Sequence, residues 1–279
     1  MRGSIGLTAA LAVTMAAVAA PLAAQSAEPN AGVWNVGGVR KAFCVRFLLD
    51  PASPALHGLP ESYHPVPASQ VHDLHVSLRG VVQDQPEFAS WSPSRVCVLA
   101  VDSVSTRDFS YADKNGKHPQ LFGLWTVTAA GAAGAPGEVA LSLFSNSGRL
   151  VRSARLAGQT VDDARLTMGK VPAVDEEGVP SQDDRFQIKI GKTTLTWDGR
   201  PARDSAAMKE AVDVAWAVSG NNGKTKVGKM QLQPPFSRPM VGSLKVDGKG
   251  DIAKALRASP TRFAGPVYLG GGGTVSFEP

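Results

Sequence analysis

Short apolar segments separated by turn residues make up most of this chain. In the clearest case, Phe186, Ile188 and Ile190 alternate with polar residues, and Gly191 and Lys192 suit a two-residue hairpin turn before the alternation resumes at Leu195 and Trp197. Because strands follow one another without a βαβ rhythm, the sequence predicts a mainly β fold (β-rich α+β), an antiparallel barrel or sandwich with two or three short helices. The other expected strands are Val39–Leu49, Val96–Val101, Leu121–Thr128, Val139–Phe144, Val212–Val218, Val227–Leu232, Met240–Val246, Pro266–Leu269 and Thr274–Phe277.

Three segments have helical patterns. Ser69 is a plausible cap for a helix carrying apolar residues at helical spacing as far as Val82, although 73–79 also alternates as a strand does. A second helix is expected from Ser147 to a terminating Gly158, and a third at Asp251–Ala258. In the second helix the apolar residues Leu150, Val151, Ala154 and Ala157 leave the opposite face to Arg149, Arg152 and Arg155.

The first residues of the chain resemble a secretory signal peptide. Arg2 is followed by an apolar run at Ile5–Leu22 and then by small residues before Glu28. The run is too short and too rich in alanine for a membrane anchor, and no later apolar stretch reaches membrane-spanning length. We therefore expect a signal peptide at 1–27, a single β-rich domain at 28–279, and a soluble periplasmic or secreted protein without a transmembrane segment.

Two cysteines, Cys44 and Cys97, each lie inside an apolar run. An oxidising compartment allows them to pair as a disulfide between two strands. Two separate buried thiols acting as small apolar residues fit the sequence equally well. Neither cysteine has the sequence context of a nucleophile.

Charge and motifs exclude several classes of function. The formal net charge falls from +5 to +4 with the loss of Arg2, and the basic residues are dispersed, which argues against a nucleic-acid partner. His72 and His75 have the spacing of two metal ligands on a helix, but a solvated helix face explains them better, so no metal is expected. Lys224 and Lys226 fit an exposed hairpin. No cofactor motif and no serine-hydrolase motif occurs, and no catalytic residue is predicted.

Five residues are candidate ligand contacts. Tyr63 and Trp91, together with Glu61 and Glu87, mark the borders of the first expected helix. This mixture of carboxylate and aromatic side chains suits the lining of a pocket, although packing alone also explains it. Solvation is the default role of the arginine row Arg149, Arg152 and Arg155. The sharper hypothesis is that these guanidinium groups guard a pocket entrance and attract a carboxylate or another anionic group of a ligand.

Two stretches carry a resemblance to a known family. A strand ending at Phe47–Asp50, followed by Leu59–Glu61 and Pro65–Pro67, resembles the opening of acetoacetate-decarboxylase-like proteins, and the arginine-bearing helix is similar to one in that family. The resemblance covers about a fifth of the chain and implies a β-barrel with an apolar cavity. The family's Schiff-base lysine motif is missing, and Lys224 and Lys226 do not match it, so decarboxylase chemistry does not carry over.

These observations predict a protein that binds a small apolar or amphipathic molecule between or within its sheets without catalysis. The first alternative is an enzyme on an acetoacetate-decarboxylase-like barrel, with a lysine or a carboxylate as the reactive group. The second alternative is an envelope-associated interaction module that uses exposed strand edges. Perturbed lysines or carboxylates in a cavity would favour the enzyme.

Overall fold

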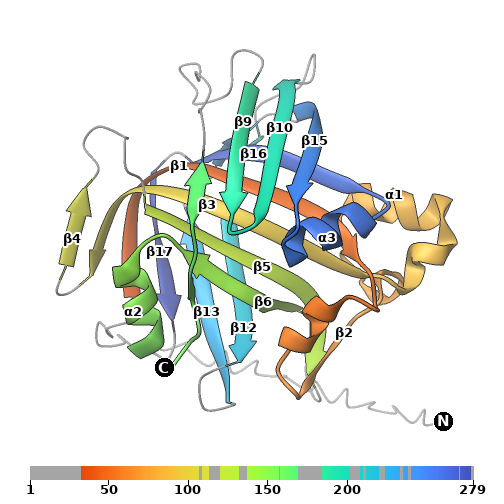
Figure 1. Ribbon diagram of the computed structural model, residues 1–279, viewed down its shortest axis with the longest axis horizontal. Coiled ribbons are helices and arrows are strands. Elements are labelled where there is room, and N and C mark those ends of the chain that lie inside the picture. The colour runs from red at the N-terminus through yellow and green to blue at the C-terminus, as the bar shows by residue number, and fades with distance from the viewer. Residues whose placement is uncertain are drawn as a thin grey trace, which may run out of the picture.

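The computed structural model describes residues 33–277 except 107–108, 113–119, 132–136, 157, 169–183, 202–207, 210–211, 220–223, 233–234, 238–239 and 270. The expected signal peptide at 1–27 lies outside these residues. Strands dominate the fold, as the sequence predicts (Figure 1). They are β1 Val33–Leu49, β2 Tyr63–Pro65, β3 Ser92–Thr106, β4 Phe109–Ala112, β5 Gln120–Gly131, β6 Gly137–Ser145, β7 Asp162–Asp163, β8 Leu166–Met168, β9 Asp184–Ile190, β10 Thr193–Pro201, β11 Met208–Lys209, β12 Val212–Ser219, β13 Thr225–Leu232, β14 Pro235–Ser237, β15 Met240–Gly248, β16 Arg262–Leu269 and β17 Gly271–Phe277.

The large sheet has 13 strands and is strongly curved. Strand β1 pairs with β3 on one side and with both β16 and β17 on the other, so the order β1-β17-β13-β12-β6-β5-β3 leads back to β1. The link between β12 and β6 is parallel and consists of one residue pair, Ala217 with Val139. The sheet therefore curls around a core without forming a regular closed barrel.

The inner face of this sheet encloses one hydrophobic cluster. Side chains on one face of β1, β3, β5 and β6 meet Trp216, Met230 and Val275 from β12, β13 and β17. Strands far apart in the sheet order contribute to the same cluster, because the curvature brings their inner faces together. Helix α2 (Gly148–Leu156) adds Leu150 and Val151 to it.

The outer face of β1, β3, β5 and β6 packs against a second, four-stranded sheet in the order β15-β10-β9-β8. A second hydrophobic cluster lies between the two sheets. It includes Ile188, Leu195 and Trp197 of the smaller sheet and Leu256 of α3 (Asp251–Ala258). Two packed sheets with three α-helices give a sandwich-like architecture, and the predicted fold class is confirmed. The hairpin β9–β10 has the predicted register, with Ile190 opposite Thr193 across the Gly191–Lys192 turn.

The helices agree with the sequence in two of three cases. Helix α3 has the predicted bounds, and α2 is capped by Ser147, whose Oγ accepts a hydrogen bond from the backbone N–H of Leu150 at 3.4 Å. The predicted first helix is wrong at its start. Helix α1 covers only Val76–Asp84, because His75 has non-helical dihedral angles (φ −52°, ψ 133°) and caps the helix in place of Ser69.

Short 3-10 turns, η1 Pro54–Gly58, η2 Ala68–Gln70 and η3 Pro86–Ser90, flank α1 on the chain. Residues of η2, η3 and α1 pack together with Leu74 and Leu78 against Leu48 of β1. No helix among the described residues is long and apolar enough to span a membrane.

Candidate functional site

A pocket of about 260 Å³ lies where the inner face of the large sheet meets the segment that leads into α1. Its sheet side is polar and its helix side is largely apolar. The polar residues come from four neighbouring strands and from the cap of α1. They are Arg46, Ser94, Arg95, Thr126, Thr128, Glu138 and His75, and Asp73 adds a further carboxylate from the segment before α1.

Strand register brings the polar residues together. Arg46 of β1 is opposite Arg95 of β3, and Arg95 is opposite Thr126 of β5. Thr128, two residues further along β5, is opposite Glu138 of β6. Side chains two apart on a strand share a face, so these residues lie on the same inner face as Cys44 and Cys97, next to the apolar cluster.

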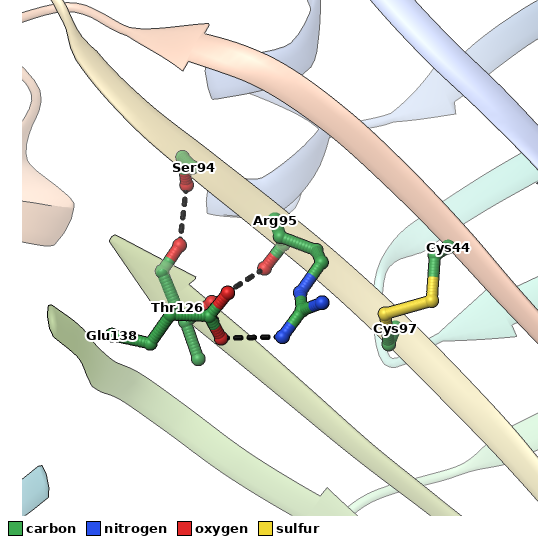
Figure 2. A network of polar contacts seen from close by, with 6 residues as sticks. All are labelled: Cys44, Ser94, Arg95, Cys97, Thr126 and Glu138. Carbon is green, nitrogen blue, oxygen red and sulfur yellow. Dashed lines mark hydrogen bonds and ion pairs between the residues drawn. A yellow bond between two sulfur atoms is a disulfide. The ribbon is translucent and has the colours of Figure 1, made fainter. Parts of the chain in front are cut away.

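Glu138 is held by two donors, and Figure 2 shows its ion pair with Arg95. Arg95 Nη2 donates to Glu138 Oε2 in an ion pair, and Thr126 Oγ1 donates to the same oxygen at 3.2 Å. The side chain of Arg95 is only 15% exposed, which strengthens the pair relative to one in water. Among the described residues nothing bonds Glu138 Oε1, so this oxygen is available to a ligand.

A second donor of Arg95 makes no hydrogen bond within the part of the protein that the structure describes. This donor is the buried Nε. Buried donors are almost always paired, so an unpaired one calls for an explanation. Arg46 stands directly opposite, and like charges opposite each other on paired strands are unfavourable. Two guanidinium groups with one orphaned N–H in a pocket are suited to binding an anion.

His75 completes the site from the helix side. Its Nδ1 accepts a hydrogen bond from the backbone N–H of Ser77 at 3.3 Å, and this arrangement requires an unprotonated Nδ1. Partial burial of the ring and, secondly, the positive charge of Arg46 lower the pKa of His75 below its usual value of 6.5. The neutral imidazole therefore carries its proton on Nε2, where it can donate to a ligand.

The residues predicted from sequence lie elsewhere. Tyr63 packs against Gly131 on β2 and β5, and Trp91 stacks edge-on against Phe88 at a ring distance of 5.0 Å. Arg149, Arg152 and Arg155 are exposed on α2. None of these five residues is among those that line this pocket.

The two cysteines form a disulfide in the structure. Cys44 and Cys97 are opposite each other on β1 and β3, with Cα atoms 4.1 Å apart. The bond lies one step along the same face from the Arg46 and Arg95 pair, and Figure 2 shows it beside the Arg95 side chain. It ties together the two strands that carry the arginines.

Sequence reasoning missed Arg46, Arg95 and Glu138. A signal was present, because each arginine interrupts an apolar strand two residues from a cysteine, where a charged side chain is costly unless it is paired. Lys224 and Lys229 are exposed on or beside β13, and the described residues that line the pocket include no lysine. Within the described ranges no cluster of His, Cys, Asp and Glu has the size of a metal site.

No protein-family model matches this chain, and no curated protein matches it. Solved structures do. The enduracididine biosynthesis enzyme MppR, complexed with pyruvate, is 11% identical with a TM-score of 0.52, and the match covers 93% of each chain. An acetoacetate decarboxylase-like enzyme from Sphingomonas wittichii RW1 is 9% identical with a TM-score of 0.50, covering 88% of this chain and 91% of that one. At these identities the likeness establishes a shared fold with acetoacetate-decarboxylase-like proteins. The regular barrel that the sequence resemblance implies is not formed by the described residues, because β12 and β6 pair at one position only.

The comparison corrects the leading functional prediction. A non-catalytic binding protein was expected because no catalytic motif stands out in the sequence. The solved structures that share the fold are described as enzymes, so that prediction is wrong and the enzyme alternative is favoured. The sequence misled because the polar residues of the pocket are far apart in the chain and form no local motif.

Proposed function

We propose that this protein is an enzyme that binds a small carboxylate substrate in the pocket and transfers a proton with Glu138. The observation that carries the proposal is the buried, unpartnered Nε of Arg95 beside Glu138, with Arg46 opposite. An arginine fork matches the geometry of a carboxylate, and a second cation nearby strengthens its attraction. A carboxylate that bridges the two guanidinium groups would also relieve their repulsion.

Five of the polar residues have a role in this proposal. Arg95 Nε and Arg46 hold the substrate carboxylate. Glu138 Oε1 takes a proton from the carbon next to the substrate carbonyl, while Arg95 and Thr126 keep the other oxygen in place. His75 Nε2–H donates to the oxygen on which negative charge develops. The proton returns from Glu138 to carbon in the reverse step, so the carboxylate is regenerated.

A 2-oxo acid is the simplest substrate of this kind. One structural neighbour is complexed with pyruvate, which supports the choice of pyruvate as the first probe. None of the described residues that line the pocket is a lysine, so the proposed step is an enolisation by acid–base chemistry without a Schiff base.

Proton transfer can be measured directly with pyruvate in deuterium oxide. We expect the protein to accelerate exchange of the methyl protons, followed by NMR, above the rate in buffer. Glu138→Gln removes the base, and we expect a loss of about 10²-fold or more with pyruvate binding retained. Arg95→Gln is expected to abolish saturable binding of pyruvate.

Glu61→Gln is the matched control, because Glu61 is exposed and outside the pocket. It should exchange pyruvate protons at the parent rate. If Glu138→Gln exchanges the pyruvate methyl protons as fast as Glu61→Gln does, Glu138 is not the base. The absence of any pyruvate binding to the parent protein, judged by calorimetry, would count against the carboxylate site as a whole.

We also propose that the chain is exported to the periplasm or secreted. The apolar run at 5–22 supports this, as does the Cys44–Cys97 disulfide, since such bonds persist in oxidising compartments. N-terminal sequencing of the protein recovered from the cell envelope should give a first residue within 25–28. An intact Met1 on a cytoplasmic protein would refute export.

A further inference from the structure

The helix side of the pocket is an apolar wall. Val71, Leu74 and Leu78 line it from the segment around η2 and from α1, and Pro93 of β3 adjoins them. Leu74 and Leu78 are buried against Leu48, so the wall is fixed by the packing of α1 on β1. It faces the same space as Arg95 and Glu138, which are on the sheet side.

Such a pocket has two chemically different ends. The cationic end suits a carboxylate, whereas Val71, Leu74 and Leu78 offer no hydrogen-bond partner to a polar tail and gain free energy when they cover an alkyl chain. The volume of about 260 Å³ is below the usual range of about 300–1,000 Å³ for drug-sized ligands, so the tail must be short.

Asp73 adds a charge to this wall. It lines the pocket between Val71 and Leu74, is exposed, and pairs with His72 at 2.9 Å. A ligand with a second carboxylate at its far end would place that group near Asp73 and against the apolar side chains. Both the like charge and the lost hydration of the second carboxylate oppose this.

We infer that the substrates are short-chain monocarboxylic 2-oxo acids whose alkyl tail packs on Val71, Leu74 and Leu78, and that dicarboxylic analogues are rejected. The inference rests on the proposed carboxylate site and specifies what lies at its other end. The apolar wall sets the preferred chain length, and Asp73 sets the preference for a single charge.

The test is a series of 2-oxo acids measured by calorimetry on the full chain. Pyruvate, 2-oxobutyrate and 2-oxopentanoate differ by one methylene each, and each should bind about fourfold more tightly than the one before until the pocket is filled. 2-Oxoglutarate should bind at least tenfold more weakly than 2-oxopentanoate. Asp73→Asn should reduce the difference in affinity between 2-oxoglutarate and 2-oxopentanoate.

Two variants test whether the apolar wall causes the dependence of affinity on chain length. Val71→Thr keeps the shape of the side chain but makes it polar, so the gain per methylene should shrink while pyruvate binding stays unchanged. Leu78→Ala should shift the preferred acid to a longer tail. Val81→Thr is the matched control, because Val81 is on α1, half-buried and outside the pocket lining, and it should keep the parent profile.

The outcomes separate the two ideas. Equal affinity for all four acids, with Arg95 still required, would overturn the apolar wall and leave the carboxylate site standing. An unchanged chain-length profile in Val71→Thr would also overturn it. Failure of every acid to bind would remove the proposed function itself. Val71→Thr preserves volume, so the test does not depend on Leu78→Ala remaining folded.

Discussion

At the scale of single residues, the unusual feature is a pair of arginines facing each other across two paired strands. Arg46 and Arg95 form the pair next to Cys44 and Cys97 on the same face of the sheet. The two cysteines of that neighbouring pair are covalently joined. The sequence shows both arginines but does not show that they lie opposite each other. Their pairing depends on the register of β1 and β3, which joins residues 49 apart in the chain. Glu138 enters the site through two further strand pairings. A local motif search finds none of this.

His75 should make stability depend on pH. Its pKa in the folded protein is lowered by partial burial and by Arg46, so below the ordinary value of 6.5 the unfolded chain binds more protons than the folded one. Stability is then fully present above about pH 6.5 and is lost as the pH falls toward the lowered pKa. His75→Asn keeps a good helix cap and removes the titration.

Urea unfolding of the ligand-free protein at pH 7.5 and 5.5 measures this effect. The parent should lose more stability over that interval than His75→Asn does. His72→Asn, which changes the exposed neighbouring histidine, should lose as much as the parent. Equal losses in His75→Asn and the parent would show that another group carries the pH dependence.

At the scale of elements, local signals predicted hairpins well and helix starts less well. The sequence predicts the β9–β10 hairpin, the β12–β13 hairpin and helix α3. In each case the signals are alternation, turn residues or helical spacing between residues that are close together in the chain. Helix α1 was expected to begin near Ser69, because Leu74 and Leu78 are one turn apart. They share a cluster in the structure, but the chain reaches Leu74 through the 3-10 turn η2 and a further turn at 72–73. Apolar spacing alone cannot separate these two routes.

The β12–β13 hairpin depends on a glycine at one position. Trp216 lies over Gly228, its partner on the opposite strand, and a Cβ at Gly228 would be 2.2 Å from Trp216 Cε2. Since Trp216 is buried in the inner cluster, it has little room to move. We expect Gly228→Ala to lower the free energy of unfolding by about 1–3 kcal/mol.

Gly80→Ala is the comparison for this prediction. Gly80 is inside α1, and a Cβ there would meet nothing within 4 Å. Alanine should raise stability by about 0.5–1 kcal/mol, because it favours a helix interior over glycine. Denaturant titration of both variants should therefore show changes of opposite sign, and a neutral Gly228→Ala would contradict the packing described for Trp216.

At the scale of the whole molecule, alternation and turn residues were enough to predict a β-rich fold of two packed faces. They could not give the order of the strands in the large sheet. That order depends on contacts between distant segments, such as β1 with β16 and β17, which leave no trace in local pattern. The inner pocket is a product of this curvature, so it was equally hidden from the sequence.

The position of β1 between β3 and the pair β16 and β17 has a consequence for synthesis. The first strand of the sheet finds some of its partners more than 200 residues later, so a chain still being made cannot complete its sheet. Until then one side of β1 is an open edge that can pair with other chains. Such distant pairing slows folding and prolongs this exposure. A nascent or exported chain of this kind would depend on holding chaperones until its last strands arrive.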